Sequence, residues 1–441
     1  MILIQEDFLQ YIWKYKYFTT SKLQTTNNES IKIYHSGNHN LDSGPDFFNA
    51  KIRIGNQIWA GNVEIHVKSS DWYVHQHEKD ENYDNVILHV VWEKDLEIYN
   101  KNNIPIPTLE IHSLVSKDLL KQYKTLFLKK ANWIQCEKVI DSIDAFTLDN
   151  WVEVLFFERL QQKSELVFQL LEESKNDWES VLFKLLAKNF GLKINGDAFL
   201  NLANSIDFRI IRKEQNKLIN LEALFFGQSG FLDKEFENIY FEELKKEYRY
   251  LQSKYNLEPI FNGQFKFFRL RPNNFPTIRI AQLSMLYFTH QNLFSKIINC
   301  NNLDEIYSLF DTKTSSFWEN HYNFSSVSKR HSKGLTKSFI DLVVINTIIP
   351  LKFIYSKHIG KLNEVPIIDL AKQTKSEKNS IISKFEDILK KNNNTKYRIK
   401  NAFESQAYLQ LKTSYCNKNL CLQCAIGNTI LKNGKEKILE N

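Results

Sequence analysis

The chain has 441 residues, of which 43% are apolar and 25% are charged, and its formal net charge is +7. This is the composition of a folded globular protein, it excludes long-range disorder, and the length predicts two or three domains. The most apolar stretch, 341–352, is too short to cross a membrane, and Glu6 and Asp7 stand where a secretory signal needs positive charge. We therefore expect a cytoplasmic protein with no membrane partner.

Charge and histidine are distributed unevenly along the chain. Residues 1–115 contain 10 Lys or Arg against 15 Asp or Glu, whereas residues 371–441 contain 14 against 6. Seven of the 11 histidines also lie in the first 115 residues. An acidic, histidine-rich head and a basic tail are typical of a nucleic-acid binder with a metal centre, although a solvated Lys-rich surface gives the same pattern.

The first 115 residues predict one helix followed by several strands. Apolar residues recur at helical spacing over 6–18 and alternate over 50–54. Gly55-Asn56 is a two-residue hairpin turn, after which alternation resumes over 58–67. Further strands are predicted at 31–34, 85–92 and 109–112. The second of these is apolar enough to be covered on both faces.

The rest of the chain predicts mainly helices. Helical apolar patterns cover 149–171, 178–190, 236–255, 278–294 and 376–391. Asn176, three residues before Glu179, has the spacing of a capping residue for the second of these helices, and Gly191 ends it. The run KFFRLR from Lys266 leads into Pro272 and predicts a loop.

Three polar residues share one face of the predicted strand near 63–68. Glu64, His66 and Lys68 alternate with apolar residues that point the other way. A metal-dependent phosphodiesterase needs such a set, because carboxylates hold a divalent cation while a basic group orients or deprotonates the attacking water. We expect these three residues to be catalytic.

Asp46 joins this face only under a geometric condition. The Gly55-Asn56 turn pairs Asp46 with Ile65, on the wrong face of the sheet. One bulge, for which Gly61 is a suitable site, shifts the pairing so that Asp46 lies opposite His66 and diagonal to Glu64. The sequence therefore predicts a bulge if Asp46 belongs to the site.

The order of a helix, GPD, a hairpin and G-x-V-E-I-H resembles the PD-(D/E)XK nuclease superfamily. The resemblance implies that Asp46 and Glu64 bind Mg²⁺ or Mn²⁺ and that Ile65 lends its backbone carbonyl to the metal. In that superfamily a lysine assists the nucleophile, but this chain has His66 at that position. Lys68, two residues later, could take over the role of the lysine from a displaced position. Glu6 in the first helix would supply a further acidic group.

A longer resemblance covers nearly the whole chain. The runs GPDFFNAKI, GNVEIHVKSSDW, YDNVILHVVW, LFFGQSGFL, RLRPNNFPTIRIAQL and CLQCAIG resemble an uncharacterised bacterial family, domain of unknown function 2851. This resemblance implies membership of a family, but it does not imply a particular reaction. We expect an α+β fold in three parts: a nuclease-like mixed sheet flanked by helices at 1–115, a mainly helical domain at 116–355, and a basic helical region with clustered cysteines at 356–441.

A second polar cluster follows the predicted strand. His75 and His77 would point the same way on a strand and, with Asp80 or His89, would bind zinc or manganese. The alternative is that these histidines cap loops or contact phosphate. His89 stands inside an apolar strand and must find a partner if it is buried, so we expect it to orient Glu64 or His66 or to satisfy a backbone carbonyl.

The C-terminal region contains three closely spaced cysteines. Cys416, Cys421 and Cys424 form C-x4-C-x2-C, and Cys136 or Cys300 would complete a four-thiolate set by folding back. Sparse cysteines in an odd number fit a reducing compartment. The pattern predicts structural zinc or an iron–sulfur cluster, and the alternative is inert thiols in a helical tail.

Arginine and phenylalanine interleave in the run KFFRLRPNNFPTIR. Arg269, Arg271 and Arg279 are the candidates for contacts to nucleic acid, or their stems pack on a helical core. The first hypothesis for function is a Mg²⁺- or Mn²⁺-dependent endo- or exonuclease, acting on DNA more readily than on RNA. The second is a non-catalytic nucleic-acid-binding or scaffold protein with a degraded site. The third is a hydrolase of a small phosphorylated or acylated substrate that uses His75 and His77.

Overall fold

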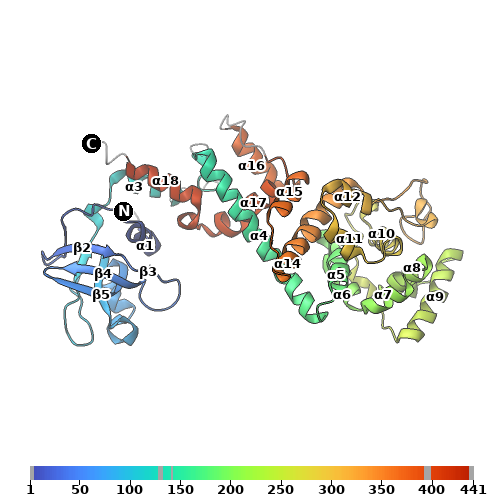
Figure 1. The fold of residues 1–441 in the computed structure, drawn as a ribbon, viewed down its shortest axis with the longest axis horizontal. Helices are drawn as coiled ribbons and strands as arrows, with labels where there is room; N and C mark the ends of the chain where they lie inside the picture. Colours follow the sequence, from blue (N-terminus) through green and yellow to red (C-terminus); the bar gives the residue numbers. More distant parts are fainter. Residues whose placement is uncertain (1–3, 128–132, 141–142, 392–398, 437–441) are drawn as a thin grey trace. The chain divides into compact units, whose positions relative to one another are not determined.

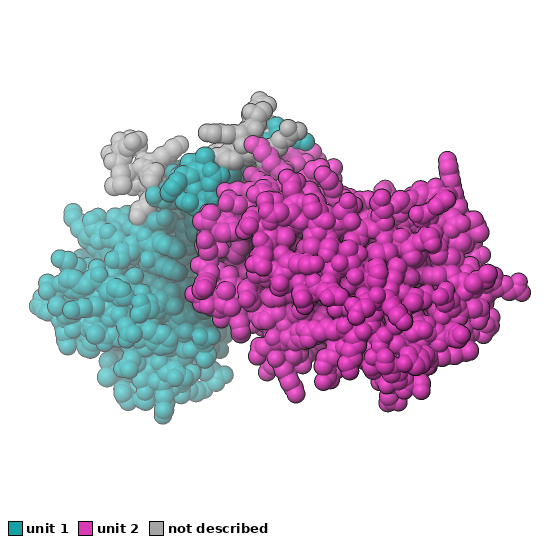
Figure 2. All heavy atoms as spheres, turned by 45° about the vertical axis from the view of Figure 1, so that its right-hand side comes forward, with its two compact units in different colours: residues 1–151, 388–394, 411–441 teal, residues 152–387, 395–410 magenta. Residues whose placement is uncertain are grey.

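The computed structural model describes residues 4–127, 133–140, 143–391 and 399–436, and it has an α+β fold (Figure 1). A mixed seven-stranded sheet near the N-terminus is followed by a largely helical region, as predicted. The chain forms two compact units, which we call the sheet unit (1–151, 388–394 and 411–441) and the helical unit (152–387 and 395–410) (Figure 2). This division differs from the three consecutive domains expected, because the C-terminal residues return to the sheet unit.

The sheet combines an antiparallel half with a parallel half. Its strands run in the order β1-β2-β4-β5-β6-β7, with β3 paired to β4. The pairs from β1 to β5 are antiparallel, whereas β5, β6 and β7 are parallel neighbours. The strands are β1 Leu23–Gln24, β2 Ser30–His35, β3 Asn38–His39, β4 Phe47–Ile54, β5 Gln57–Lys68, β6 Val86–Glu93 and β7 Thr108–Glu110.

The central hairpin follows directly from the local sequence. Gly55 has a φ of 58°, so the two-residue turn closes with Ile54 opposite Gln57, as predicted. The side chains at 50, 52 and 54 are buried and those between them are exposed. Strand β6 is buried at Leu88–Val91, which fits its continuous apolar run.

In the described part of the sheet unit, three α-helices precede the helical unit. They are α1 Glu6–Tyr15, α2 Asp71–Val74 and α3 Lys117–Phe127. The apolar face of α1, including Phe8, Ile12 and Trp13, is fully buried, and this helix packs against β5. It ends three residues earlier than expected because Lys16 adopts a left-handed conformation with a φ of 52°.

The remaining helices match the predicted pattern in most positions. Their bounds are α4 Ala145–Glu173, α5 Trp178–Phe190, α6 Leu192–Asn204, α7 Phe208–Glu214, α8 Leu218–Gln228, α9 Ile239–Tyr255, α10 Pro276–Thr289, α11 Leu293–Asn299, α12 Leu303–Leu309, α13 Lys337–Val343, α14 Ile349–His358, α15 Val365–Gln373, α16 Ser380–Lys391, α17 Ala402–Gln410 and α18 Ala425–Glu436. The cap predicted at Asn176 is wrong by one residue. Asp177 accepts the hydrogen bonds from the N–H groups of Glu179 and Ser180, because Asn176 has a φ of 64° and lies outside the helix.

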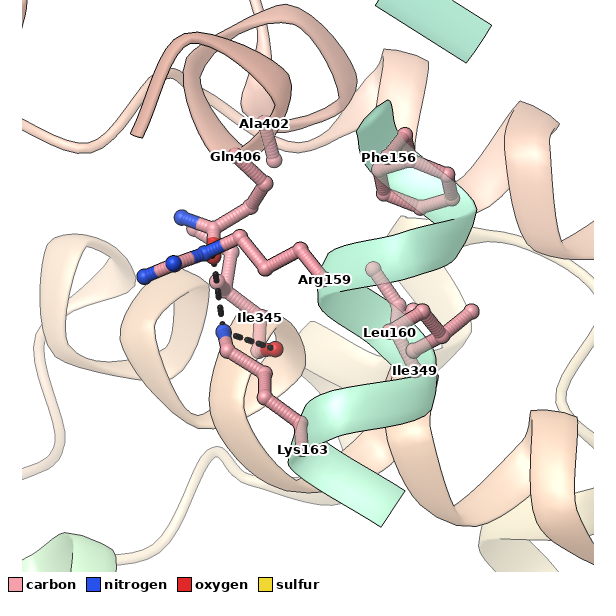
Figure 3. Close-up of a pocket in the computed structure, with 8 residues that line it drawn as sticks. All are labelled: Phe156, Arg159, Leu160, Lys163, Ile345, Ile349, Ala402 and Gln406. Atoms are coloured by element: carbon pink, nitrogen blue, oxygen red, sulfur yellow. Dashed lines mark hydrogen bonds between the residues drawn. The ribbon is translucent and has the colours of Figure 1, made fainter. Parts of the chain in front are cut away.

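The interior of the helical unit contains a buried ammonium group. Lys163 of α4 donates hydrogen bonds to the Ile345 carbonyl and to Gln406 Oε1, at 3.3 and 2.7 Å (Figure 3). It also donates to Asn346 Oδ1 at 2.8 Å, while Arg159 donates to the same Gln406 oxygen. Burial lowers the pKa of Lys163 to about 7, with the nearby Arg159 charge acting in the same direction.

Among the residues that the structure describes, one helical segment, 337–358, is long and apolar enough to cross a membrane. Within the structure, 72% of its most apolar window is buried inside the protein, which is also the property of a core helix. A single segment of this kind is weak evidence for a membrane span.

Candidate functional site

A bulge in β4 places Asp46 beside Glu64. The pairing of β4 with β5 shifts between Phe47 and Ala50, where Asn49 has a φ of 58°. The need for a bulge was predicted correctly, but its strand and the resulting register were wrong. The bulge lies in β4 and not at Gly61 of β5, so Phe47 pairs with Val63 and Asp46 comes opposite Glu64 instead of His66. Glycine is needed at 61 for another reason, since a Cβ atom there would lie 2.4 Å from Ile87.

The two carboxylates are held by the backbone and by α1. The Asp46 N–H donates to Glu64 Oε2 at 3.1 Å, and the Ile65 N–H donates to Asp46 Oδ2 at 3.0 Å. Gln10 of α1 donates to the other Asp46 oxygen at 2.8 Å. Both oxygens of Asp46 thus have donors, whereas Glu64 Oε1 faces the histidines.

Three imidazoles lie close together, and two of them contact Glu64 Oε1. His66 follows Glu64 on the same face of β5, and its Nε2 atom lies 3.5 Å from Glu64 Oε1 and 3.1 Å from His75 Nδ1. His77 Nε2 is buried, lies 3.4 Å from Glu64 Oε1 and makes no hydrogen bond within the described part of the chain. The donor atoms of the three histidines all lie within 4.8 Å of one another.

These separations match the edges of a metal coordination shell. Zinc binds imidazole nitrogen at about 2.0–2.1 Å in tetrahedral geometry, which places neighbouring ligand atoms about 3.3 Å apart. The three measured separations of 3.1, 3.4 and 3.5 Å lie close to that value. His66, His75 and His77 therefore have the geometry to hold one divalent ion, and Glu64 Oε1 lies beside two of them. We call these four residues the histidine–carboxylate site.

The two later histidines reach the site from a helical turn and not from the strand that was expected. His75 follows α2, and His77 begins the 3₁₀ turn His77–Lys79. Gln76 between them has a φ of 60°, and this left-handed residue turns the chain so that both rings face His66. Tyr83 stacks on His77 with ring centroids 3.7 Å apart and closes that side.

His89 on β6 positions His66. The parallel register places His89 beside Glu64, and its Nε2 atom lies 2.8 Å from His66 Nδ1. A hydrogen bond at Nδ1 leaves His66 Nε2 as the atom that faces the other ligands. His89 thus contacts one of the partners expected for it, and it is itself completely buried.

Burial favours the neutral forms of Asp46, Glu64, His66 and His89. It raises the pKa of Asp46 to about 8, where the charge of Glu64 adds to the effect, and it raises the pKa of Glu64 to about 8. It lowers the pKa of His66 to about 2 and that of His89 to about 3. Neutral imidazoles are the form that binds metals, and the protonated carboxyls would be ionised by a cation.

The comparison with protein families matches residues 6–380 to the model described as "Protein of unknown function (DUF2851)". The chain belongs to this family. Neither the curated proteins nor the solved structures contain a significant match. Membership in DUF2851 carries no assigned reaction, so the chemistry has to be argued from the site itself.

Glu6 and Lys68 lie at the edge of the histidine–carboxylate site. Glu6 is half-buried in the first turn of α1, and its pKa is raised by burial and lowered by the nearby His75. Lys68 is exposed, and its ammonium group makes no ion pair or hydrogen bond among the described residues. Ile65 contributes its N–H to Asp46, while the expected use of its carbonyl stays a prediction.

One of the three arginines predicted to contact nucleic acid is unavailable for that role. Arg279 is only 6% exposed, and its guanidinium donates to Gln282 and Asn274 and lies 3.6 Å from the ring centre of Phe339. The prediction for Arg279 is therefore wrong, because the helical core surrounds it. Arg269 and Arg271 are exposed in the predicted loop.

Two supporting residues were missed in the sequence. Gln10 has no motif around it, but its place on α1 one turn after Glu6 was a usable signal. Tyr83 stands six residues after His77, and only the fold of the intervening 3₁₀ turns brings its ring onto the imidazole.

Proposed function

We propose that the sheet unit is a metal-dependent hydrolase that cleaves phosphodiester bonds in nucleic acid. The observation that carries the proposal is the convergence of Glu64 Oε1, His66 Nε2 and His77 Nε2 at 3.4–3.5 Å, with His75 Nδ1 close by. Three nitrogens and one oxygen suit zinc or manganese better than magnesium, which prefers oxygen ligands.

Each residue has a defined part in this proposal. A divalent ion held by His66, His75, His77 and Glu64 would supply Lewis acidity, which lowers the pKa of a bound water and polarises a phosphoryl oxygen. Asp46 holds Glu64 in position through its backbone N–H and is itself held by Gln10. Glu6, at the half-buried edge with a raised pKa, is placed to accept a proton from the attacking water.

Nucleic acid is favoured as the substrate by the resemblance to PD-(D/E)XK nucleases and by the basic residues elsewhere. Helix α1, Asp46, the β4–β5 hairpin and Glu64 follow the order of that superfamily. The proposal also explains why this chain has His66 where that superfamily has lysine, because His66 acts as a metal ligand and does not replace the lysine. Lys68, exposed two residues further along β5, is then free to contact a phosphate.

The test is cleavage of labelled single- and double-stranded DNA and RNA by the full chain with Mn²⁺, Zn²⁺ or Mg²⁺. We expect Glu64→Gln and His77→Ala each to reduce cleavage by at least about 100-fold. Matched controls are Glu93→Gln, an exposed glutamate on β6, and His112→Ala, an exposed histidine of the same unit. Both controls should cleave like the wild type.

Two outcomes would replace the proposal. Nucleic-acid binding that weakens in Arg269→Ala and Arg271→Ala, without cleavage under any metal, would establish a binding protein, which the exposure of this arginine loop favours. Hydrolysis of p-nitrophenyl phosphate or acetate alone would establish a small-substrate hydrolase. Neither Glu64→Gln nor His77→Ala can separate these two enzyme classes, because Glu64 and His77 belong to one site, so the class is decided by which substrate is hydrolysed.

A further inference from the structure

Four cysteines from distant parts of the chain meet in the sheet unit. Cys136, Cys416, Cys421 and Cys424 line one small cavity of about 20 Å³. Cys136 and Cys424 are buried and the other two are half-buried. They are close enough that the charges of the other three would raise the pKa of Cys136, in addition to the larger effect of its burial. The fold thus completes the C-x4-C-x2-C motif with Cys136 and not with Cys300, which belongs to the helical unit.

Several contacts hold the C-terminal segment in this position. Helix α18 packs against α3, which precedes Cys136. Gly427 in the first turn of α18 is required by this packing, because a Cβ atom there would lie 2.0 Å from the Cys421 carbonyl oxygen. Lys412 donates to the Trp133 carbonyl at 2.8 Å and lies over the Trp133 ring. Packing between α18 and α3 and the contacts of Lys412 with Trp133 therefore hold the segments that carry the cysteines together.

The sulfur atoms are less closely grouped than the imidazole nitrogens of His66, His75 and His77. A zinc ion at about 2.3 Å from four sulfurs holds them about 3.8 Å apart. Within the described ranges, the histidines form a group of three donor atoms that all lie within 4.8 Å of one another, but no three of these cysteines do so. A cluster of several iron and sulfide atoms, in contrast, keeps its cysteine sulfurs farther apart and fills the space between them.

We propose that Cys136, Cys416, Cys421 and Cys424 bind an iron–sulfur cluster. Four thiolates are the ligand set of both the two-iron and the four-iron type. The surroundings suit the negative charge of such a centre, since Cys424 immediately precedes the N-terminus of α18 and the Lys412 charge acts on Cys416. The cavity is mostly apolar, with Leu126 and Leu411 in its wall, which shields the cluster from water.

The cluster is independent of the hydrolase proposal, and its test is the composition of the protein. The full chain is purified without oxygen, or is reconstituted with ferrous iron and sulfide, and is analysed for iron, acid-labile sulfide and zinc. We expect iron and sulfide in roughly equal amounts, together with broad visible absorbance that bleaches on reduction. Zinc without sulfide, or no metal after reconstitution, would overturn the proposal.

Matched variants assign the ligands. Cys136→Ser and Cys421→Ser should each lose most of the bound iron, whereas Cys300→Ser should keep it. Far-ultraviolet circular dichroism checks that the variants fold. If Cys136→Ser retains the iron and sulfide of the wild type, Cys136 is not a ligand and the four-cysteine centre is refuted. A variant that unfolds is replaced by cysteine alkylation of the wild type with and without the cluster, where protection of all four thiols is expected.

Discussion

Metal binding at the histidine–carboxylate site should release a proton from Glu64. Burial raises the pKa of this carboxyl to about 8, so at pH 7 it is mostly protonated and must ionise before Oε1 binds a cation. His66, with its pKa lowered to about 2, is already neutral and releases no proton. The affinity for Mn²⁺ should therefore rise with pH and level off above pH 8.

The size of the effect follows from one titrating group. A carboxyl with a pKa of about 8 is ionised to roughly 3% at pH 6.5 and to roughly 50% at pH 8. The affinity should accordingly rise about 15-fold over that interval, or about 1.6 kcal/mol. Isothermal titration calorimetry with Mn²⁺, repeated in buffers of different ionisation enthalpy, measures both the affinity and the released protons, and about one proton is expected at pH 7.

Glu64→Gln removes the proton together with the charged ligand. The variant should bind Mn²⁺ more weakly, and its affinity should change by less than about twofold between pH 6.5 and pH 8. Glu93→Gln should behave like the wild type. A wild-type affinity that does not change with pH, or a slope that survives in Glu64→Gln, would show that Glu64 is not the titrating ligand.

Three further changes have defined outcomes. His89→Phe should weaken Mn²⁺ binding by about 10- to 100-fold in calorimetry, because it removes the partner of His66 Nδ1 while every ligand remains. Gly427→Ala should lower the iron content and destabilise the sheet unit by about 1–3 kcal/mol in urea unfolding, since the new Cβ atom meets the Cys421 carbonyl. In the helical unit, the pKa of Lys163 is about 7 when folded and returns to its higher ordinary value on unfolding. At a pH between the folded and the unfolded pKa of Lys163, the unfolded state binds more protons than the folded state. The free energy of unfolding should therefore rise by about 2 kcal/mol from pH 7 to pH 9 in urea unfolding, and Lys163→Met should abolish this rise.

Features set by neighbouring residues were predictable from the sequence. The β4–β5 hairpin follows from Gly55-Asn56 and the alternation on each side, and α5 follows from its apolar period. The position of the bulge is a harder case, since glycine at 61 was the obvious candidate. Asn49 takes the left-handed conformation, which asparagine tolerates better than most residues, and so a local signal existed but was weaker.

Features set by long-range pairing were not predictable in the same way. The contact of His89 with His66 depends on the register of the parallel strands β5 and β6, and no turn specifies that register. The choice of Cys136 over Cys300 depends on α18 packing on α3, far away in sequence. The role of Arg279 could not be read from composition. A run of basic and aromatic residues looks the same on a nucleic-acid-binding surface and in a core, and here the core supplies hydrogen-bond acceptors for the guanidinium.

Helix α1 connects the two proposed centres of the sheet unit. Its Gln10 donates to Asp46, which in turn orients Glu64, and the helix also contacts the 3₁₀ turn Cys421–Gln423. A cluster bound by Cys421 would fix that turn and therefore restrict the movement of α1. A shift of α1 would remove the Gln10 donor from a buried carboxylate. A cluster at this turn would therefore also help to hold the geometry of the histidine–carboxylate site.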